Sequence, residues 1–220
     1  MNDATDSTDV NHAIDALDAF EGAKREILEV IKGSEVPEDF PHANNTLQWL
    51  LRLNPTADQA LQIAALAHDI DRASTQRKVH RADYPDYDVF KAAHAENGAT
   101  ILGEILNAHD LEPSIVRESC RLVRLHEVGG CPRSDLLKDA DSLSYFEVNL
   151  HHYFQREGLA ETRRRTLWGY RRLSPEAQPL ARRIITQSVE LEPWPALRRE
   201  LLAVMPPKRL HGAVPPATMA

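Results

Sequence analysis

Apolar residues recur at intervals of three and four along most of the chain, and no segment alternates convincingly between apolar and polar residues. This spacing gathers apolar side chains on one face of an α-helix. The sequence therefore predicts an all-α protein, a helical bundle with additional N- and C-terminal helices. The predicted helices cover residues 10–32, 41–53, 57–70, 86–107, 113–127 and about 134–154, and two or three covering helices are expected between residues 157 and 204.

Residues that commonly start or stop helices support these boundaries. Pro41 suits the first turn of a helix, and Gly33 and Asn54, which precedes a proline, suit helix ends. The first helix should pack through one apolar face. That face consists of Ile14, Leu17, Phe20, Ile27 and Ile31.

The segment "LQIAALAHDIDRA", residues 61–73, is apolar around most of its circumference and then becomes charged. A helix that is apolar on all sides is expected at the centre of a bundle. His68, Asp69 and Arg72 would then lie at a buried or half-buried helix end. Charges in such a place need compensation, and this makes them candidates for a functional site.

Length and composition fit one compact domain. With 220 residues, of which 42% are hydrophobic, the chain can bury a sizeable core. We expect a single domain over residues 10–204, a flexible segment at residues 1–9 and a Pro-rich tail at residues 205–220. The polar and basic stretch "ASTQRKVHRADY", residues 73–84, is expected to be a loop.

Charge and cysteine content narrow the choice of partners and compartment. A formal net charge of −7 argues against general nucleic-acid binding, which depends on clustered Lys and Arg. The acidic N-terminus does not resemble a secretory signal, and no apolar run reaches membrane-spanning length. The two cysteines, Cys120 and Cys131, fit reduced thiols better than a disulfide framework. We therefore expect a cytoplasmic protein without membrane association.

Histidines and aspartates occur where separate helices could bring them together. His42, His68, His94 and His126 fall on four predicted helices, Asp69 follows His68, and Asp141 lies on a fifth helix. Such side chains are common metal ligands, and a bound cation would offset the cost of burying the carboxylates. Ordinary roles remain open for three of them: His42 could cap its helix, His94 could face solvent and His126 could interact with a helix dipole.

The order of these motifs resembles that of the HD superfamily of metal-dependent phosphohydrolases. A histidine is followed by "HD", then by two separated histidines and finally by "DADSL", and the resemblance covers about residues 38–150. It implies two divalent metal ions, of Fe, Mn, Co, Ni or Mg, that share Asp69 as a bridge. The implied ligands are His42, His68, Asp69 and Asp141 for the first ion, with His94 and His126 completing the second. The family pattern "ADxL" selects Asp141 over the neighbouring Asp139.

The same resemblance implies a reaction. The expected activity is hydrolysis of a small phosphorylated substrate, such as a nucleotide or related phosphate ester, by metal-activated water, with Asp69 and Arg72 in catalytic roles. Two alternatives stay open: a di-iron oxygenase that uses the same ligand order, and a non-catalytic binding protein with the same fold. The "GYP" motif expected of a cyclic-dinucleotide phosphodiesterase is absent after His126.

Basic residues near the proposed ligands are candidates for binding phosphate. Arg72 lies one helical turn after His68 and could stabilise the phosphate charge. In the loop, Arg77, Lys78 and Arg81 are the expected substrate-binding residues. A second basic cluster is expected to be a solvated helix face. It consists of Arg163, Arg164, Arg165, Arg171 and Arg172.

Overall fold

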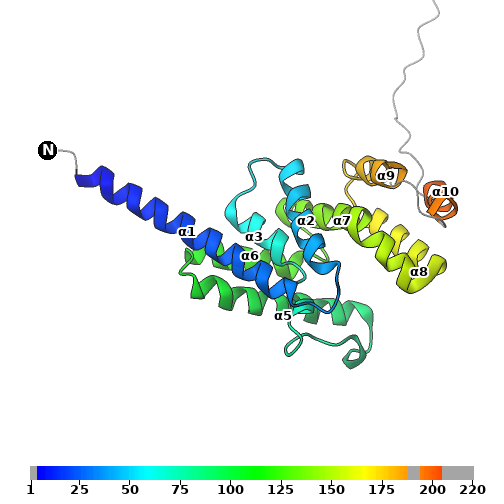
Figure 1. Cartoon of the computed structure of the whole chain (residues 1–220), viewed down its shortest axis with the longest axis horizontal. Helices are drawn as coiled ribbons and strands as arrows, with labels where there is room; N and C mark the ends of the chain where they lie inside the picture. The colour runs from blue at the N-terminus through cyan, green and yellow to red at the C-terminus, as the bar shows by residue number, and fades with distance from the viewer. Residues whose placement is uncertain (1–3, 188–193, 205–220) are drawn as a thin grey trace, which may run out of the picture.

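The computed structural model describes residues 4–187 and 194–204, and its regular elements are all helical (Figure 1). The all-α prediction is therefore confirmed. The predicted tail at residues 205–220 lies outside the described residues. The α-helices are α1 (Ala4–Lys32), α2 (Asp39–Leu53), α3 (Gln59–Ala67), α4 (Ile70–Ala73), α5 (Tyr87–Ala108), α6 (Pro113–Leu125), α7 (Pro132–Ser144), α8 (Leu150–Arg172), α9 (Gln178–Gln187) and α10 (Trp194–Val204), with a 3₁₀ turn, η1 (Arg81–Asp83), and a π-helical turn, η2 (Tyr145–Asn149).

Helix α3 lies at the centre of the bundle, as its apolar sequence predicted. It packs against α1, α2, α6 and α7. Leu61, Ile63 and Leu66 are at most 3% exposed, and burying each such side chain stabilises the fold by about 1.5–3 kcal/mol. Asp58 caps the helix by accepting a hydrogen bond from the backbone N–H of Leu61 at 3.0 Å. The last residue of this central helix immediately precedes the "HD" pair.

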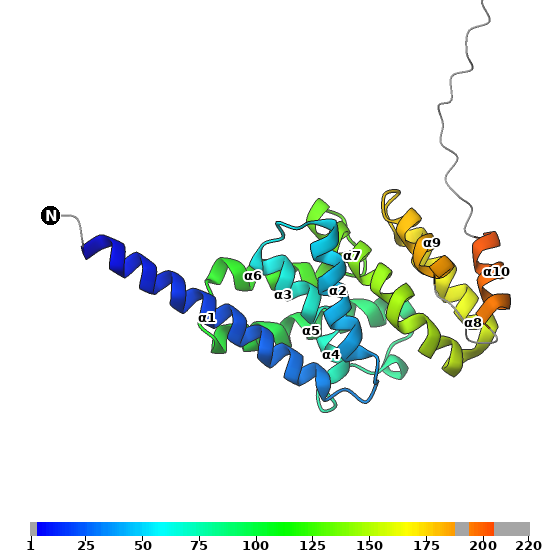
Figure 2. The ribbon, with the colours of Figure 1, turned by 45° about the horizontal axis from the view of Figure 1, so that its top comes forward.

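Helix α1 differs from its prediction in two respects. It begins at Ala4, so residues 4–9, expected to be flexible, are helical. Phe20 and Ile27 are buried as predicted, but Ile14 and Leu17 are 52% and 56% exposed. Figures 1 and 2 show why: the first half of α1 extends beyond the other described helices, so this part of its apolar face has nothing to pack against.

The chain turns sharply at the "HD" pair. The predicted helix over residues 57–70 ends at Ala67, and Asp69 leaves helical geometry with φ −106° and ψ 17° before α4 begins. Residues 74–86 follow largely without regular structure, apart from η1, as the loop prediction indicated. The break at Asp69 separates the directions of α3 and α4 and lets the carboxylate point into the interior.

The segment predicted as one helix from about residue 134 to 154 is part of a longer run. It passes from α7 through η2 into α8. Within α8, Gly158 has φ 74° and ψ −177°, a conformation that is essentially restricted to glycine. Helix α8 therefore consists of two helical segments that meet in a kink at Gly158. Figure 2 shows α8, α9 and α10 together at one end of the molecule.

Two further expectations concern the chain as a whole. Among the described helices, none combines the length and apolar character needed to cross a membrane. Cys120 is buried, Cys131 is half-buried and both are free, in agreement with the expectation of reduced thiols.

Candidate metal centre

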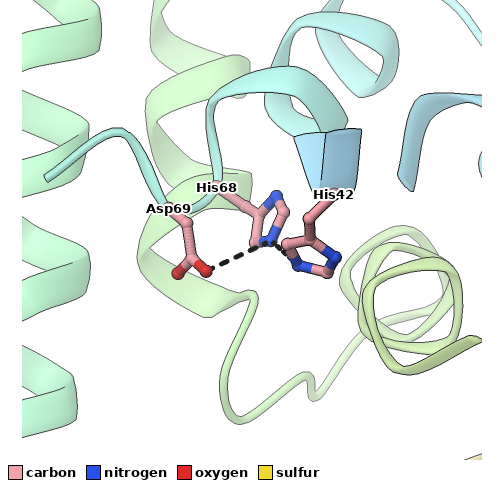
Figure 3. A group of neighbouring side chains, drawn as sticks. All are labelled: His42, His68 and Asp69. Carbon is pink, nitrogen blue, oxygen red and sulfur yellow. Dashed lines mark hydrogen bonds and ion pairs between the residues drawn. The ribbon is translucent and has the colours of Figure 1, made fainter. Parts of the chain in front are cut away.

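The six predicted ligand side chains meet in the interior of the bundle. They come from the first turn of α2, the end of α3, the middle of α5, the end of α6 and the last half of α7. Figure 3 shows His42, His68 and Asp69 pointing toward one another. The Nε2 atoms of His42 and His68 are 3.1 Å apart. Their predicted convergence is therefore found in the structure.

The ligand atoms form two groups that share one carboxylate. His42, His68 and Asp69 offer atoms that all lie within 4.8 Å of one another, and Asp69, His94 and His126 do the same. Asp69 Oδ1 lies 3.0 Å from His94 Nε2 and 3.9 Å from His126 Nε2. These residues could hold two cations with Asp69 between them.

Asp141 completes the first group, whereas Asp139 does not contribute. The Oδ1 atom of Asp141 lies 3.3 Å from His42 Nε2 and 3.5 Å from His68 Nε2. Asp139 instead accepts a hydrogen bond from the backbone N–H of Ser174 at 2.8 Å, and burial raises the pKa of its carboxyl. Asp139 and Asp141 are two residues apart and so lie on nearly opposite faces of α7, which separates a candidate ligand from a structural carboxylate.

The Nδ1 atoms of all four histidines are engaged by neighbouring acceptors. His68 Nδ1 donates to the carbonyl oxygen of Ala65 at 3.0 Å, and His126 Nδ1 donates to that of Val123 at 2.7 Å. Backbone carbonyls only accept, so both Nδ1 atoms carry hydrogen. His94 Nδ1 donates to the Oδ2 atom of Asp71 at 2.8 Å.

The Nδ1 atom of His42 also carries hydrogen, and its acceptor is the hydroxyl of Ser144. The hydroxyl of Ser144 donates to the carbonyl oxygen of His42 at 3.1 Å, so it accepts from His42 Nδ1 at 2.8 Å. Each neutral imidazole then directs an Nε2 lone pair toward the centre. Two such lone pairs, those of His42 and His68, would face each other at 3.1 Å. Either a proton on one of these nitrogens or a bound cation relieves this repulsion, so the donor set fits a metal that takes the place of the proton.

The carboxylates give the centre a strong preference for positive charge. Burial alone would raise the pKa of Asp69, but the charges of Arg72 and His68 hold it well below its usual range. Burial likewise opposes the low pKa of Asp141, which Arg172, His42 and His68 maintain. Against the effect of burial, Asp69 and Asp141 raise the pKa of His68 to about 9. In the absence of metal, protons therefore supply the positive charge.

A cavity of about 360 Å³ opens over this centre. Five of the six candidate ligands line it, namely His42, Asp69, His94, His126 and Asp141. Its other walls are rich in basic and aromatic side chains. These are Arg72, Lys91, Arg156, Arg164, Arg165 and Arg172, with Tyr87, Phe90, Tyr145, Tyr153 and Trp168.

A family model described as "Domain of unknown function (DUF4202)" matches residues 9–192, most of the chain. The chain belongs to the DUF4202 family. No curated protein and no solved structure matches it. The matched range includes every candidate ligand and the whole of α8, so both the candidate metal centre and the cavity walls of this DUF4202 chain lie within the family domain.

Arg72 is placed near the centre, as predicted. It lines the cavity of the DUF4202 domain, and its Nη1 donates to Asp69 Oδ2 at 2.6 Å. Its Nη2 lies 3.0 Å from Asp39 Oδ1. This pairing orients the shared carboxylate and keeps a fixed positive charge beside it.

The three loop residues predicted to bind substrate are not brought to the cavity. Arg77 pairs with Glu104 and Lys78 with Glu35, at 2.5 and 2.8 Å between the charged atoms. Arg81 donates to the carbonyl oxygen of Tyr84 at 2.7 Å. None of the three lines the cavity. The structure therefore does not bring these three residues to the cavity, and acidic partners elsewhere in the chain pair with Arg77 and Lys78.

The second basic cluster was misassigned in part. Arg163 and Arg171 are exposed, as expected of a solvated face. Arg165 and Arg172 instead line the cavity together with Trp168. The spacing of three and seven places positions 165, 168 and 172 on one face of α8. This spacing could have indicated from the sequence that Arg165 and Arg172 share a surface with Trp168.

Two acidic residues near the centre were also missed. Asp71 is 1% exposed and holds His94 through its Nδ1. Glu127 lines the cavity, with its Oε1 atom 3.8 Å from His126 Nε2 and its Oε2 atom 3.7 Å from Arg172 Nη1. Asp71 directly precedes Arg72, and Glu127 directly follows His126, so each is adjacent to a residue that the sequence had singled out.

Proposed function

We propose that this DUF4202 protein is a cytoplasmic metal-dependent phosphohydrolase with an HD-type centre, acting on a small phosphorylated compound such as a nucleotide or related phosphate ester. The observation that carries the proposal is the pair of ligand groups that share Asp69 at the floor of a cavity lined by basic side chains. Carboxylate and imidazole ligands suit Fe, Mn, Co and Ni, and a carboxylate-rich site also suits Mg.

In this proposal, one set of residues binds the metal ions and another binds the substrate phosphate. His42, His68, Asp69 and Asp141 would hold one divalent ion, and His94 and His126 would join Asp69 at the second. Such ions, when bound, lower the pKa of water and neutralise charge that develops on phosphate. Arg172 has its Nη1 atom 3.3 Å from Asp141 Oδ2, so its guanidinium is within reach of an oxygen of a phosphate bound at this centre.

Metal content is the first test of the proposal. Purified protein should hold close to two ions per chain. Asp69→Ala should lose most of both because Asp69 belongs to both ligand groups, whereas His126→Ala should lose mainly one. His80→Ala, which removes an exposed histidine of the loop, is the matched control and should retain both. Full metal content in Asp69→Ala would refute the shared carboxylate.

Activity is the second test. The metal-loaded protein should release phosphate from at least one member of a panel of phosphorylated metabolites, and Asp69→Ala should not. Oxygen consumption by the iron-loaded protein, without phosphate release, would instead identify the di-iron oxygenase alternative. Tight binding of a phosphorylated compound without turnover would indicate a binding protein.

A further inference from the structure

Arg165 differs from the other basic side chains around the cavity. Five of the six have a carboxylate partner within 4.0 Å: Arg72 with Asp69, Lys91 with Asp88, Arg156 with Glu38, Arg164 with Glu161 and Arg172 with Asp141. Arg165 is half-buried, and no carboxylate among the described residues lies within ion-pair distance of it. Its side chain hydrogen-bonds to a neutral group instead: Nη1 donates to the Tyr87 hydroxyl at 3.0 Å.

Trp168 concentrates positive charge beside Arg165. The Cζ atoms of Arg165 and Arg172 lie 4.6 and 4.8 Å from the centre of the Trp168 ring, and Lys91 Nζ lies 5.1 Å from it. Each contact is a favourable cation–π interaction, but the three cations repel one another. Three cations therefore lie around the one Trp168 ring.

Neighbouring acids offset only part of this charge. Arg172 has Asp141 and Glu127, and Lys91 has Asp88 and Glu127. The charge of Arg165 remains without a paired anion. Burying a cation in this way is costly unless an anion joins it. The cavity therefore places a cation without a carboxylate partner at Arg165, apart from the candidate metal centre.

We infer that Arg165 is a specificity-determining residue that binds a second anionic group of the substrate, so that the preferred substrate carries two linked anionic groups, such as a diphosphate. This inference rests on the proposed function, because the first anionic group is the phosphate held at the metal centre. Arg172 connects the two positions: it lies beside Asp141 and shares the Trp168 ring with Arg165. One short ligand can therefore extend from one position to the other.

Two non-hydrolysable probes test the inference by binding alone. The metal-loaded protein is titrated calorimetrically with methylphosphonate, which has one anionic group, and with methylenediphosphonate, which has two. Arg165→Gln should weaken diphosphonate binding roughly tenfold to a hundredfold, the usual effect of losing a hydrogen bond between charged groups, and change methylphosphonate binding by less than about twofold. Metal content is measured after each titration because diphosphonates chelate metals.

Arg163→Gln is the matched control, since Arg163 lies on the exposed face of the same helix, and it should bind both probes as the wild type does. An equal loss for both probes in Arg165→Gln, or no loss for either, would overturn the inference while leaving the proposed function standing. If the metal-loaded wild type binds neither probe, both fail. Should Arg165→Gln not fold, Arg165→Lys keeps the charge but loses the planar fork, and unchanged diphosphonate binding by that variant would overturn the inference.

Discussion

Asp71 holds the ring of His94 in place: its Oδ2 atom accepts a hydrogen bond from His94 Nδ1 at 2.8 Å, while His94 Nε2 faces Asp69 at 3.0 Å. The other oxygen of Asp71 accepts from the backbone N–H of Val79 at 3.2 Å and from the amide of Asn97. A carboxylate that fixes a metal-binding histidine in this way sets its tautomer and raises its basicity. Asp71 therefore links the second ligand group to the loop at Val79.

We predict that Asp71→Asn weakens metal binding at the His94 group roughly tenfold to a hundredfold and leaves the His42 group unchanged. An amide at position 71 cannot accept from all three donors, so the His94 ring loses its fixed orientation. Calorimetric titration with metal should resolve the weakened site. Asp83→Asn, an exposed loop variant, should bind metal as the wild type does, and equal weakening at both sites would contradict a local role for Asp71.

The metal-free protein should lose stability as the pH rises from about 6.5 to about 9. Although burial opposes it, the neighbouring carboxylates raise the pKa values of His68 and His94 from an ordinary 6.5 to about 9. The folded state therefore binds these protons more tightly than the unfolded state. Their contribution to the free energy of unfolding is full below pH 6.5 and is lost as the pH rises through about 9.

Metal must displace the same protons, so the apparent metal affinity should increase over this pH interval. Urea unfolding in the presence of chelator, compared with unfolding of the metal-loaded protein, measures both effects. At a free metal concentration of about 100 times the dissociation constant, binding should add about 2.7 kcal/mol to the free energy of unfolding. Stability of the metal-free protein that rises between pH 6.5 and 9 would contradict the assigned charges.

Arg72 and the loop should differ in their kinetic effects. Arg72→Ala is expected to lower kcat roughly tenfold to a thousandfold at equal metal loading, because it removes a fixed charge beside the shared carboxylate. The combined variant Arg77→Ala, Lys78→Ala and Arg81→Ala should keep wild-type kcat and KM, since these side chains do not line the cavity. Steady-state kinetics on a substrate from the metabolite panel provides the comparison, and a raised KM in the loop variant would restore its predicted role.

Gly158→Ala should destabilise the protein through backbone strain alone. A Cβ atom at Gly158 would have no heavy atom within 4 Å, so no steric clash contributes. The conformation, with φ 74° and ψ −177°, costs a non-glycine residue of order 1–3 kcal/mol. Gly169→Ala is the control, because its Cβ would make only ordinary contacts, the nearest at 3.6 Å to Phe146. Thermal unfolding of both variants should show a fall in Tm for Gly158→Ala only.

Much of the fold and the ligand set could be predicted from the sequence because both depend on local patterns. Helical spacing and the apolar run of α3 predicted the bundle and its centre. The types and order of His42, His68 and Asp141 predicted a cluster before any geometry was known. The exposure of Ile14 and Leu17 could not be predicted in this way, because the sequence of α1 does not say how far the rest of the bundle extends along it.

The substrate side of the site was harder to predict because it depends on pairing between distant residues. Arg77 and Lys78 looked free in the sequence, yet Glu104 and Glu35 neutralise them from 27 and 43 positions away. Arg165 looked solvated, yet it is half-buried and lines the cavity. Whether a basic residue is paired or available is a property of the folded arrangement.

The two parts of the cavity come from successive stretches of the chain. All candidate metal ligands lie between His42 and Asp141, whereas the wall bearing Arg165, Trp168 and Arg172 belongs to a single later helix, α8. On the proposed function, the residues expected to activate water and those expected to select the substrate therefore lie in successive stretches of the chain. A protein engineer could vary Arg165 to redirect the choice of anion while keeping Arg172, which contacts the candidate ligand Asp141, and leaving every candidate ligand residue unchanged.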